Sequence, residues 1–171
     1  EQDVAELSTW TRWLAGRTGK APVVIGQGVG GIQIAAMLDA REAPVDRALL
    51  VDTHAFQQRR SGAPGVAGDA HGIAFYRLGY CARYAGTAAA SGSYLAWDRD
   101  RVQQALLALD APVTLISGGG TARVGTDWVR ALEEGGVAVR SIPGVEHFFD
   151  LAHASELLDV VLRVIAETDH G

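Results

Sequence analysis

Apolar residues along the chain follow two spacings, which predict a series of strands and helices. Short unbroken apolar runs, bounded by Gly, Pro or charged residues, are typical of strands covered on both faces of a parallel sheet. Apolar residues three and four positions apart predict amphipathic helices, and Val4, Leu7, Trp10 and Leu14 share one such face. We expect strands over 22–26, 47–52, 112–116 and 137–142, and helices over 3–15, 29–41, 75–90, 98–109, 126–134 and 154–167.

These elements alternate along the chain, which is typical of an α/β fold: a mostly parallel sheet with helices on both faces. The 171 residues, 48% of them hydrophobic, suffice for a single domain over 1–171 with its own core. Between the second and third strands the pattern is less regular, and residues 59–72 are rich in Gly, Ala and Pro. We expect the segment of about 54–110 to form a helical lid inserted into the sheet domain.

The whole fold is organised around residues 23–38, VVIGQGVGGIQIAAML. Three β-branched residues lead into a glycine-dense turn, and a long apolar helix follows. This strand–turn–helix places the turn at the carboxyl edge of a parallel sheet, where ligands and catalytic groups collect. Two motifs match it: the nucleophile elbow G-x-S-x-G over residues 26–30, with Gly28 in place of serine, and the dinucleotide fingerprint G-x-G-x-x-G.

The dinucleotide alternative is a Rossmann-type domain that binds NAD or FAD. Its glycines would be Gly26, Gly28 and Gly31, and Asp52, at the end of the next strand, would hold the ribose hydroxyls. An amphipathic helix precedes the fingerprint strand, however, whereas a Rossmann domain usually begins with that strand. The second half of the chain carries no further fingerprint.

From about residue 3 to residue 167 the order of features resembles the C-terminal two-thirds of an α/β-hydrolase. A helix, the elbow, a strand ending in RALLVD, a lid, PVTLISGG, a W-x-x-A-L-x-x-G-G segment, IPGVEHFF and a final helix follow one another. The chain is most similar to the thioesterase domains that release polyketide chains. In those domains the catalytic acid follows the strand after the elbow, and the histidine lies in a P-G-x-x-H loop.

The resemblance implies that Asp52 is the catalytic acid and His147 the base, because these residues occupy the matching positions. The turn at 117–121, where other α/β-hydrolases carry the acid, has no carboxylate. Gly28 stands at the nucleophile position and cannot attack a carbonyl, so the serine is lost. In this fold the backbone N–H that follows the nucleophile is one oxyanion donor, which assigns that role to Val29.

The function expected from this resemblance is binding of, or action on, a polyketide or other acyl thioester, presented on an acyl carrier protein. Without a serine the domain would be non-hydrolytic, weakly active or a pseudoenzyme, with His147 and Asp52 as an acid–base pair. Candidate substrate-binding residues are Gln27 at the elbow and the aromatic residues Phe75, Tyr76, Tyr80 and Tyr84 of the lid. No cofactor is needed for this chemistry, and His54, His71 and His153 lack a metal-ligand spacing with one another.

Charge and composition limit the partners. The formal net charge of −5 disfavours a nucleic-acid backbone as a ligand, and no apolar run approaches membrane-spanning length. The single cysteine, Cys81, excludes an internal disulfide framework and fits the cytoplasm. The first strands of the hydrolase fold have no counterpart before Glu1. We therefore expect an N-terminal segment, a second chain or a dimer mate to cover the edge of the strand at 23–25.

Overall fold

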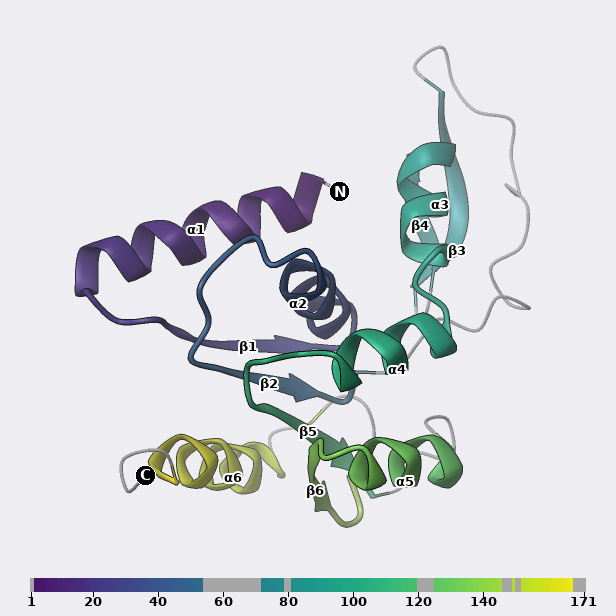
Figure 1. Cartoon of the computed structure of the whole chain (residues 1–171). Coiled ribbons are helices and arrows are strands. Elements are labelled where there is room, and N and C mark those ends of the chain that lie inside the picture. Colours follow the sequence, from purple (N-terminus) through teal and green to yellow (C-terminus); the bar gives the residue numbers. More distant parts are fainter. Residues whose placement is uncertain are drawn as a thin grey trace. The chain divides into compact units, whose positions relative to one another are not determined.

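The computed structural model describes residues 2–53, 72–78, 81–119, 125–145, 149 and 152–167. The chain divides into two compact units (Figure 1). One spans residues 55–104, and the other joins residues 2–54 to residues 105–171. Each unit is described below by itself.

The larger unit is built on a four-stranded parallel sheet with the order β1-β2-β5-β6, as the sequence pattern predicts. Its strands are β1 (Val23–Gln27), β2 (Arg47–Val51), β5 (Val113–Gly118) and β6 (Ala138–Ile142). The helices are α1 (Gln2–Thr18), α2 (Val29–Asp39), α5 (Thr126–Glu134) and α6 (Ala154–Ala166), while α4 (Arg99–Leu107) ends within this unit. Each strand of this sheet pairs with the strand of the same sheet that follows it in the sequence, so every crossover moves in the same direction across the sheet.

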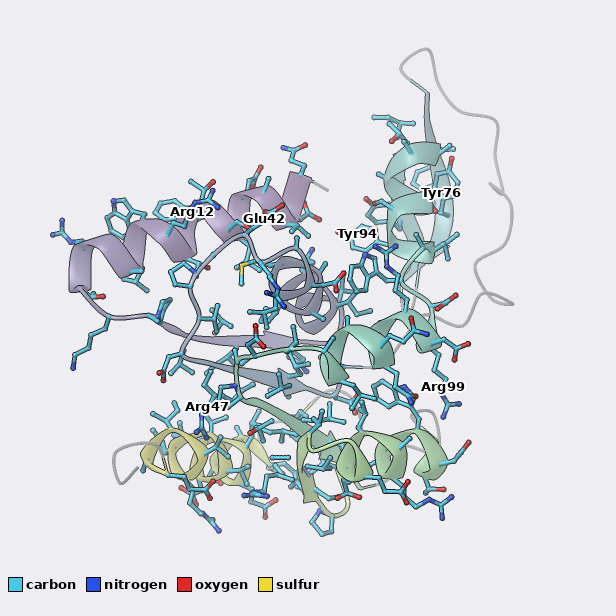
Figure 2. All side chains as sticks on the ribbon, viewed as in Figure 1. Arg12, Glu42, Arg47, Tyr76, Tyr94 and Arg99 are labelled. Atoms are coloured by element: carbon cyan, nitrogen blue, oxygen red, sulfur yellow. The ribbon has the colours of Figure 1, made fainter. Side chains whose placement is uncertain are left out.

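The apolar runs of the sequence form buried strands because they contribute to a hydrophobic core on the α6 side of the sheet. Leu49, Val51 and Ile116 on the strands pack with Val164 of α6, and all four are at most 3% exposed. At the start of β2, Nη1 of Arg47 donates a hydrogen bond of 2.9 Å to the carbonyl oxygen of Val164 (Figure 2). Burying each such aliphatic side chain contributes roughly 1.5–3 kcal/mol, which makes this layer the main stabilising feature of the α6 side.

The first helix forms where it is predicted, but its apolar face is not buried against the described residues. Trp10 is 66% exposed and Leu14 is 40% exposed, whereas Ser8 and Thr11 are buried. The hydroxyl of Ser8 donates to Oε2 of Glu42 at 2.7 Å, and that of Thr11 to the Leu7 carbonyl at 2.8 Å. Because their hydroxyls are hydrogen-bonded, small polar residues can line the contact with α2.

The predicted helix over residues 75–90 is wrong. The smaller unit contains instead an antiparallel pair, β3 (Ile73–Leu78) and β4 (Cys81–Thr87), followed by α3 (Ala88–Leu95). The aromatic and apolar residues of this segment also fit a period of two, and Gly86 within the expected helix disfavours that helix. Tyr76 pairs with Tyr84 across the hairpin, and Tyr84 makes an edge-to-face contact with Tyr94 of α3. The inserted segment is therefore partly β-structured.

No helix within the described part of the chain is both long and apolar enough to cross a membrane.

Candidate active site

The elbow between β1 and α2 has a sharply bent backbone at Gly28. This residue has φ 53° and ψ −114°, outside the regions that L-residues occupy readily. Its N–H donates to the carbonyl oxygen of Val51 at 2.9 Å, and its own carbonyl accepts from the Gly31 N–H at 3.2 Å. The chain thus turns from strand to helix within one residue, with Gly28 at the apex and Val29 as the first helical residue.

The flanking glycines are required by close packing within this elbow. A Cβ on Gly26 would lie 2.6–2.7 Å from backbone atoms of Gly30 and Gly31. A Cβ on Gly31 would lie 1.7 Å from Oγ1 of Thr53. Gly30 by contrast has open space around the position of a Cβ. The spacing that suggests a dinucleotide fingerprint is therefore explained by the tight strand–turn–helix itself.

Asp52 lies at the carboxyl end of β2, beside the elbow. Gln27 and Val51, the last residues of β1 and β2, are register partners. Gly28 follows Gln27 and Asp52 follows Val51, so both residues lie just beyond neighbouring strand ends. Asp52 is 1% exposed, and its N–H donates to the Ile116 carbonyl at 2.7 Å. Its φ of 44° lies in the left-handed region, which Asp tolerates better than most residues. The structure thus brings together the ends of β1 and β2 that carry these predicted site positions.

The other predicted site residues fall into three groups. Val29 is half-buried and Gln27 is exposed at the elbow. Phe75, Tyr76 and Tyr84 belong to the smaller unit, where Phe75 is 39% exposed. His147 and Tyr80 lie outside the described residues, so the roles of base and substrate contact assigned to them stay predictions.

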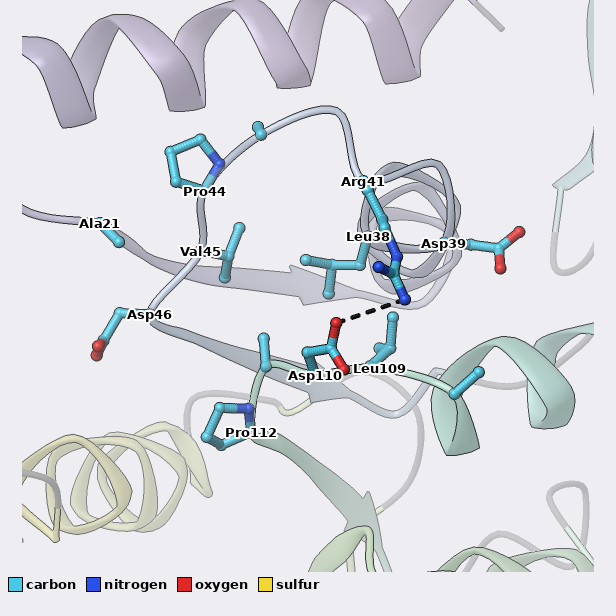
Figure 3. A pocket seen from close by; sticks show the side chains of 13 residues that line it. Ala21, Leu38, Asp39, Arg41, Pro44, Val45, Asp46, Leu109, Asp110 and Pro112 are labelled. Carbon is cyan, nitrogen blue, oxygen red and sulfur yellow. Dashed lines mark ion pairs between the residues drawn. The ribbon is translucent and has the colours of Figure 1, made fainter.

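One cavity in the larger unit was not predicted from the sequence. It has a volume of about 620 Å³ and lies at the amino ends of the strands, opposite the elbow (Figure 3). It is lined by Ala21, Asp46 and Pro112, from the segments that lead into β1, β2 and β5, together with Arg41 and Asp110. Nη2 of Arg41 and Oδ2 of Asp110 lie 3.5 Å apart, and both side chains are more than three-quarters exposed. No pattern in the sequence distinguishes these loop residues from ordinary surface positions.

Metal ligation has no support in the described part of the chain: it contains no group of three or more His, Cys, Asp or Glu residues that could hold a metal ion.

The sheet order argues against the dinucleotide alternative. In a Rossmann domain the fingerprint strand lies inside the sheet, at the point where the strand order reverses, and its ligand lies in the crevice formed there. Here β1 pairs with β2 and the sheet continues through β5 and β6 without a reversal. Among the described strands, the glycine-rich turn is therefore not at a switch point.

The sequence matches no protein-family model and no curated protein. Solved structures share its fold. The esterase domain of a Rhodothermus marinus protein is similar with a TM-score of 0.67 and 16% identity, over 95% of this chain and 68% of that one. A monoacylglycerol lipase from Paleococcus ferrophilus has a TM-score of 0.67 and 13% identity, over 96% and 75% of the two chains.

A carboxylesterase structure from Nitrososphaera gargenis is also similar, with a TM-score of 0.60 and 16% identity, over 95% of this chain and 71% of that one. At these identities the likeness concerns the fold. Together with the parallel sheet and the sharp turn from β1 into α2, it shows that the chain has a fold of the α/β-hydrolase type.

Proposed function

We propose that this chain is a thioesterase-like α/β-hydrolase domain that binds or acts on an acyl thioester without a serine nucleophile. The observation that carries the proposal is the backbone at Gly28: φ 53° and ψ −114° at the apex of a strand-to-helix turn. A nucleophile elbow holds its serine on such a strained turn. Glycine adopts this conformation at low cost, so the elbow persists although the reactive side chain is gone.

The buried carboxyl group beside the elbow supports the same proposal. Asp52 follows the strand that pairs with β1, at the place of the catalytic acid in polyketide thioesterases, and is 1% exposed. A buried carboxylate can fix the orientation of a histidine and stabilise its charged form. In the proposed site His147 is that histidine, and the N–H of Val29 donates to the oxyanion.

The chemistry open to such a site is direct attack by water. His147 takes a proton from water while the water oxygen bonds to the thioester carbonyl carbon, and the N–H of Val29 stabilises the oxyanion. The C–S bond then breaks, and the proton held by His147 passes to the leaving thiolate. Loss of the nucleophile in a triad costs on the order of 10⁶-fold in kcat, so the native chain is expected to be slow or to serve for binding only.

The test is restoration of the nucleophile. Native protein and the Gly28→Ser variant would be given a simple acyl thioester, with free thiol measured over time and intact mass followed for an acyl adduct. Gly28→Ala is the matched control, because it imposes the same backbone strain without supplying a hydroxyl. We expect an acyl adduct and faster turnover only in Gly28→Ser, and loss of that gain when His147→Ala is added.

A folded Gly28→Ser variant that forms no adduct and releases no thiol contradicts the thioesterase proposal. If the native chain shows slow turnover that His147→Ala abolishes, the acid–base pair is active without a serine. If the native chain binds the thioester equally well with and without His147→Ala and never turns it over, the domain is a binding module.

A further inference from the structure

The cavity at the amino ends of the strands combines an apolar wall with two opposite charges at its rim. Its volume of about 620 Å³ lies in the range of small-molecule sites. Leu38 is buried in its wall, and Val45 and Leu109 are half-buried there. Figure 3 shows Arg41 reaching from the end of α2 toward Asp110, which precedes β5. All the lining residues belong to the larger unit, so the cavity lies within that unit.

Arg41 occupies a backbone position that favours glycine. Its φ is 52°, in the left-handed region. The Arg41 N–H donates to the Leu38 carbonyl at 2.9 Å. The Glu42 N–H donates to the Met37 carbonyl at 3.3 Å. These two bonds form a Schellman motif at the end of α2, in which the left-handed residue is usually glycine. The arginine side chain is therefore held at the cavity by a strained turn, a feature that recurs at ligand sites.

The ion pair with Asp110 contributes little to offset this strain. Nη2 of Arg41 lies 3.5 Å from Oδ2 of Asp110, farther than the about 2.7–2.9 Å of a close charge-assisted hydrogen bond. The two side chains are 77% and 86% exposed, so water and salt screen their attraction. Both charged groups therefore remain available to a ligand, the guanidinium as a donor and the carboxylate as an acceptor.

The other charges at the cavity narrow the class of ligand. Asp39 and Asp46 also line it, and neither forms an ion pair with a described residue. The C-terminal end of α2 adds a partial negative charge. This surplus of negative charge repels a ligand that carries only a carboxylate and attracts an ammonium group. An ammonium group that binds Asp110 leaves Arg41 without its partner, unless the same ligand also carries a carboxylate.

We propose that this cavity binds an aliphatic α-amino acid in its zwitterionic form. The ligand carboxylate accepts hydrogen bonds from the guanidinium of Arg41, and the ligand ammonium group donates to the carboxylate of Asp110. The 3.5 Å between Nη2 and Oδ2 suits two charges carried on one carbon atom. The aliphatic side chain packs on Leu38, Val45 and Leu109. One exposed ion pair is replaced by two, and apolar area is buried in the same step.

The test uses L-leucine and three probes that each lack one of its parts, added to the 171-residue chain. Isopentylamine lacks the carboxylate, isocaproate lacks the ammonium group, and glycine lacks the aliphatic side chain. Binding would be measured by saturation-transfer difference NMR and isothermal titration calorimetry at low ionic strength. We expect L-leucine to bind about two- to fivefold more tightly than either singly charged probe, and more tightly than glycine.

Two substitutions separate the charged contacts. Arg41→Gln should weaken binding of L-leucine and isocaproate about two- to fivefold without weakening isopentylamine. Asp110→Asn should weaken L-leucine and isopentylamine without weakening isocaproate. The matched controls Arg130→Gln and Glu133→Gln make the same changes in net charge at exposed positions of α5 outside the cavity, and should leave every affinity unchanged.

The proposal is overturned if none of the four compounds binds in the millimolar range, or if L-leucine binds no better than isopentylamine or glycine. It is also overturned if Arg41→Gln and Arg130→Gln have the same effect on L-leucine, since the charge would then act without contact. The cavity lies opposite the elbow, and thioester chemistry plays no part in these readouts. Failure here therefore leaves the proposed function untouched, and the reverse also holds.

Discussion

Replacing Gly28 by alanine measures how much conformational strain the elbow imposes on a side chain. At φ 53° and ψ −114° a Cβ is forced into a region that L-residues rarely occupy. Strain of this kind costs about 1–3 kcal/mol, while the loss of glycine's freedom in the unfolded chain offsets about 0.4–1 kcal/mol. We therefore expect Gly28→Ala to lower the free energy of unfolding by about 1–2 kcal/mol.

The control lies two residues away in the same turn. Gly30 has no positive φ, a Cβ at this position would have nothing within 4 Å, and the residue is already helical. Gly30→Ala should raise the free energy of unfolding by about 0.5–1 kcal/mol, because alanine loses less freedom than glycine on entering a helix. The two substitutions add the same methyl group and should shift stability in opposite directions.

The assay is urea denaturation followed by circular dichroism, with thermal melts as a second measure. For a chain of this size 1 kcal/mol corresponds to about 2–4 °C in Tm, so the two variants should melt several degrees apart. The reasoning fails if Gly28→Ala is as stable as the native protein, or if both variants shift in the same direction. The bend at Gly28 would then be free to relax, and an elbow that holds no strain would not support the proposed function.

Three further substitutions test other parts of the structure. Gly31→Ala should destabilise by about 1–3 kcal/mol through overpacking against Thr53, and Thr53→Ala should recover part of the loss in a double-mutant cycle measured by urea denaturation; simple additivity would contradict the contact. Leu49→Ala should cost about 2–5 kcal/mol in the same assay, because Leu49 is fully buried, and a change below about 1 kcal/mol would argue against this core. Arg41→Ala should change stability by less than about 1 kcal/mol, since its ion pair with Asp110 is exposed; a larger loss in the melts would show that the cavity beside it is structurally important.

The regular part of the fold could be predicted because local pattern and final environment agree. The runs that form β1, β2 and β5 are apolar and rich in β-branched residues or leucine, and the turns between elements carry Gly or Pro. The glycine-rich elbow could also be placed, since Gly26 packs against the backbone of Gly30 and Gly31 in the same turn. Predictions of this kind depend on short stretches of chain.

The errors arise where neighbours distant in sequence decide the structure. A period of three or four residues identifies α1 as a helix, but which of its faces is buried depends on α2 and the turn after it, where Thr11 and Ser8 find hydrogen-bond partners in Met37 and Glu42. In the inserted segment Tyr76 and Tyr84 fit a helix and a hairpin alike, and cross-strand pairing decides for the hairpin. Pairing of that sort is not visible in a one-dimensional pattern.

The uniform strand order also has a consequence for how the protein folds. Val24 pairs with Ala48, 24 positions later, and Thr114 with Ala138, again 24 positions later, whereas Ala48 pairs with Val113, 65 positions later. Closing the longer loop costs only about 0.9 kcal/mol more in chain entropy than closing a shorter one. The two halves of the sheet can therefore form as local units and join last, and the junction between them tolerates an insertion whose length and structure can change with little effect on the sheet.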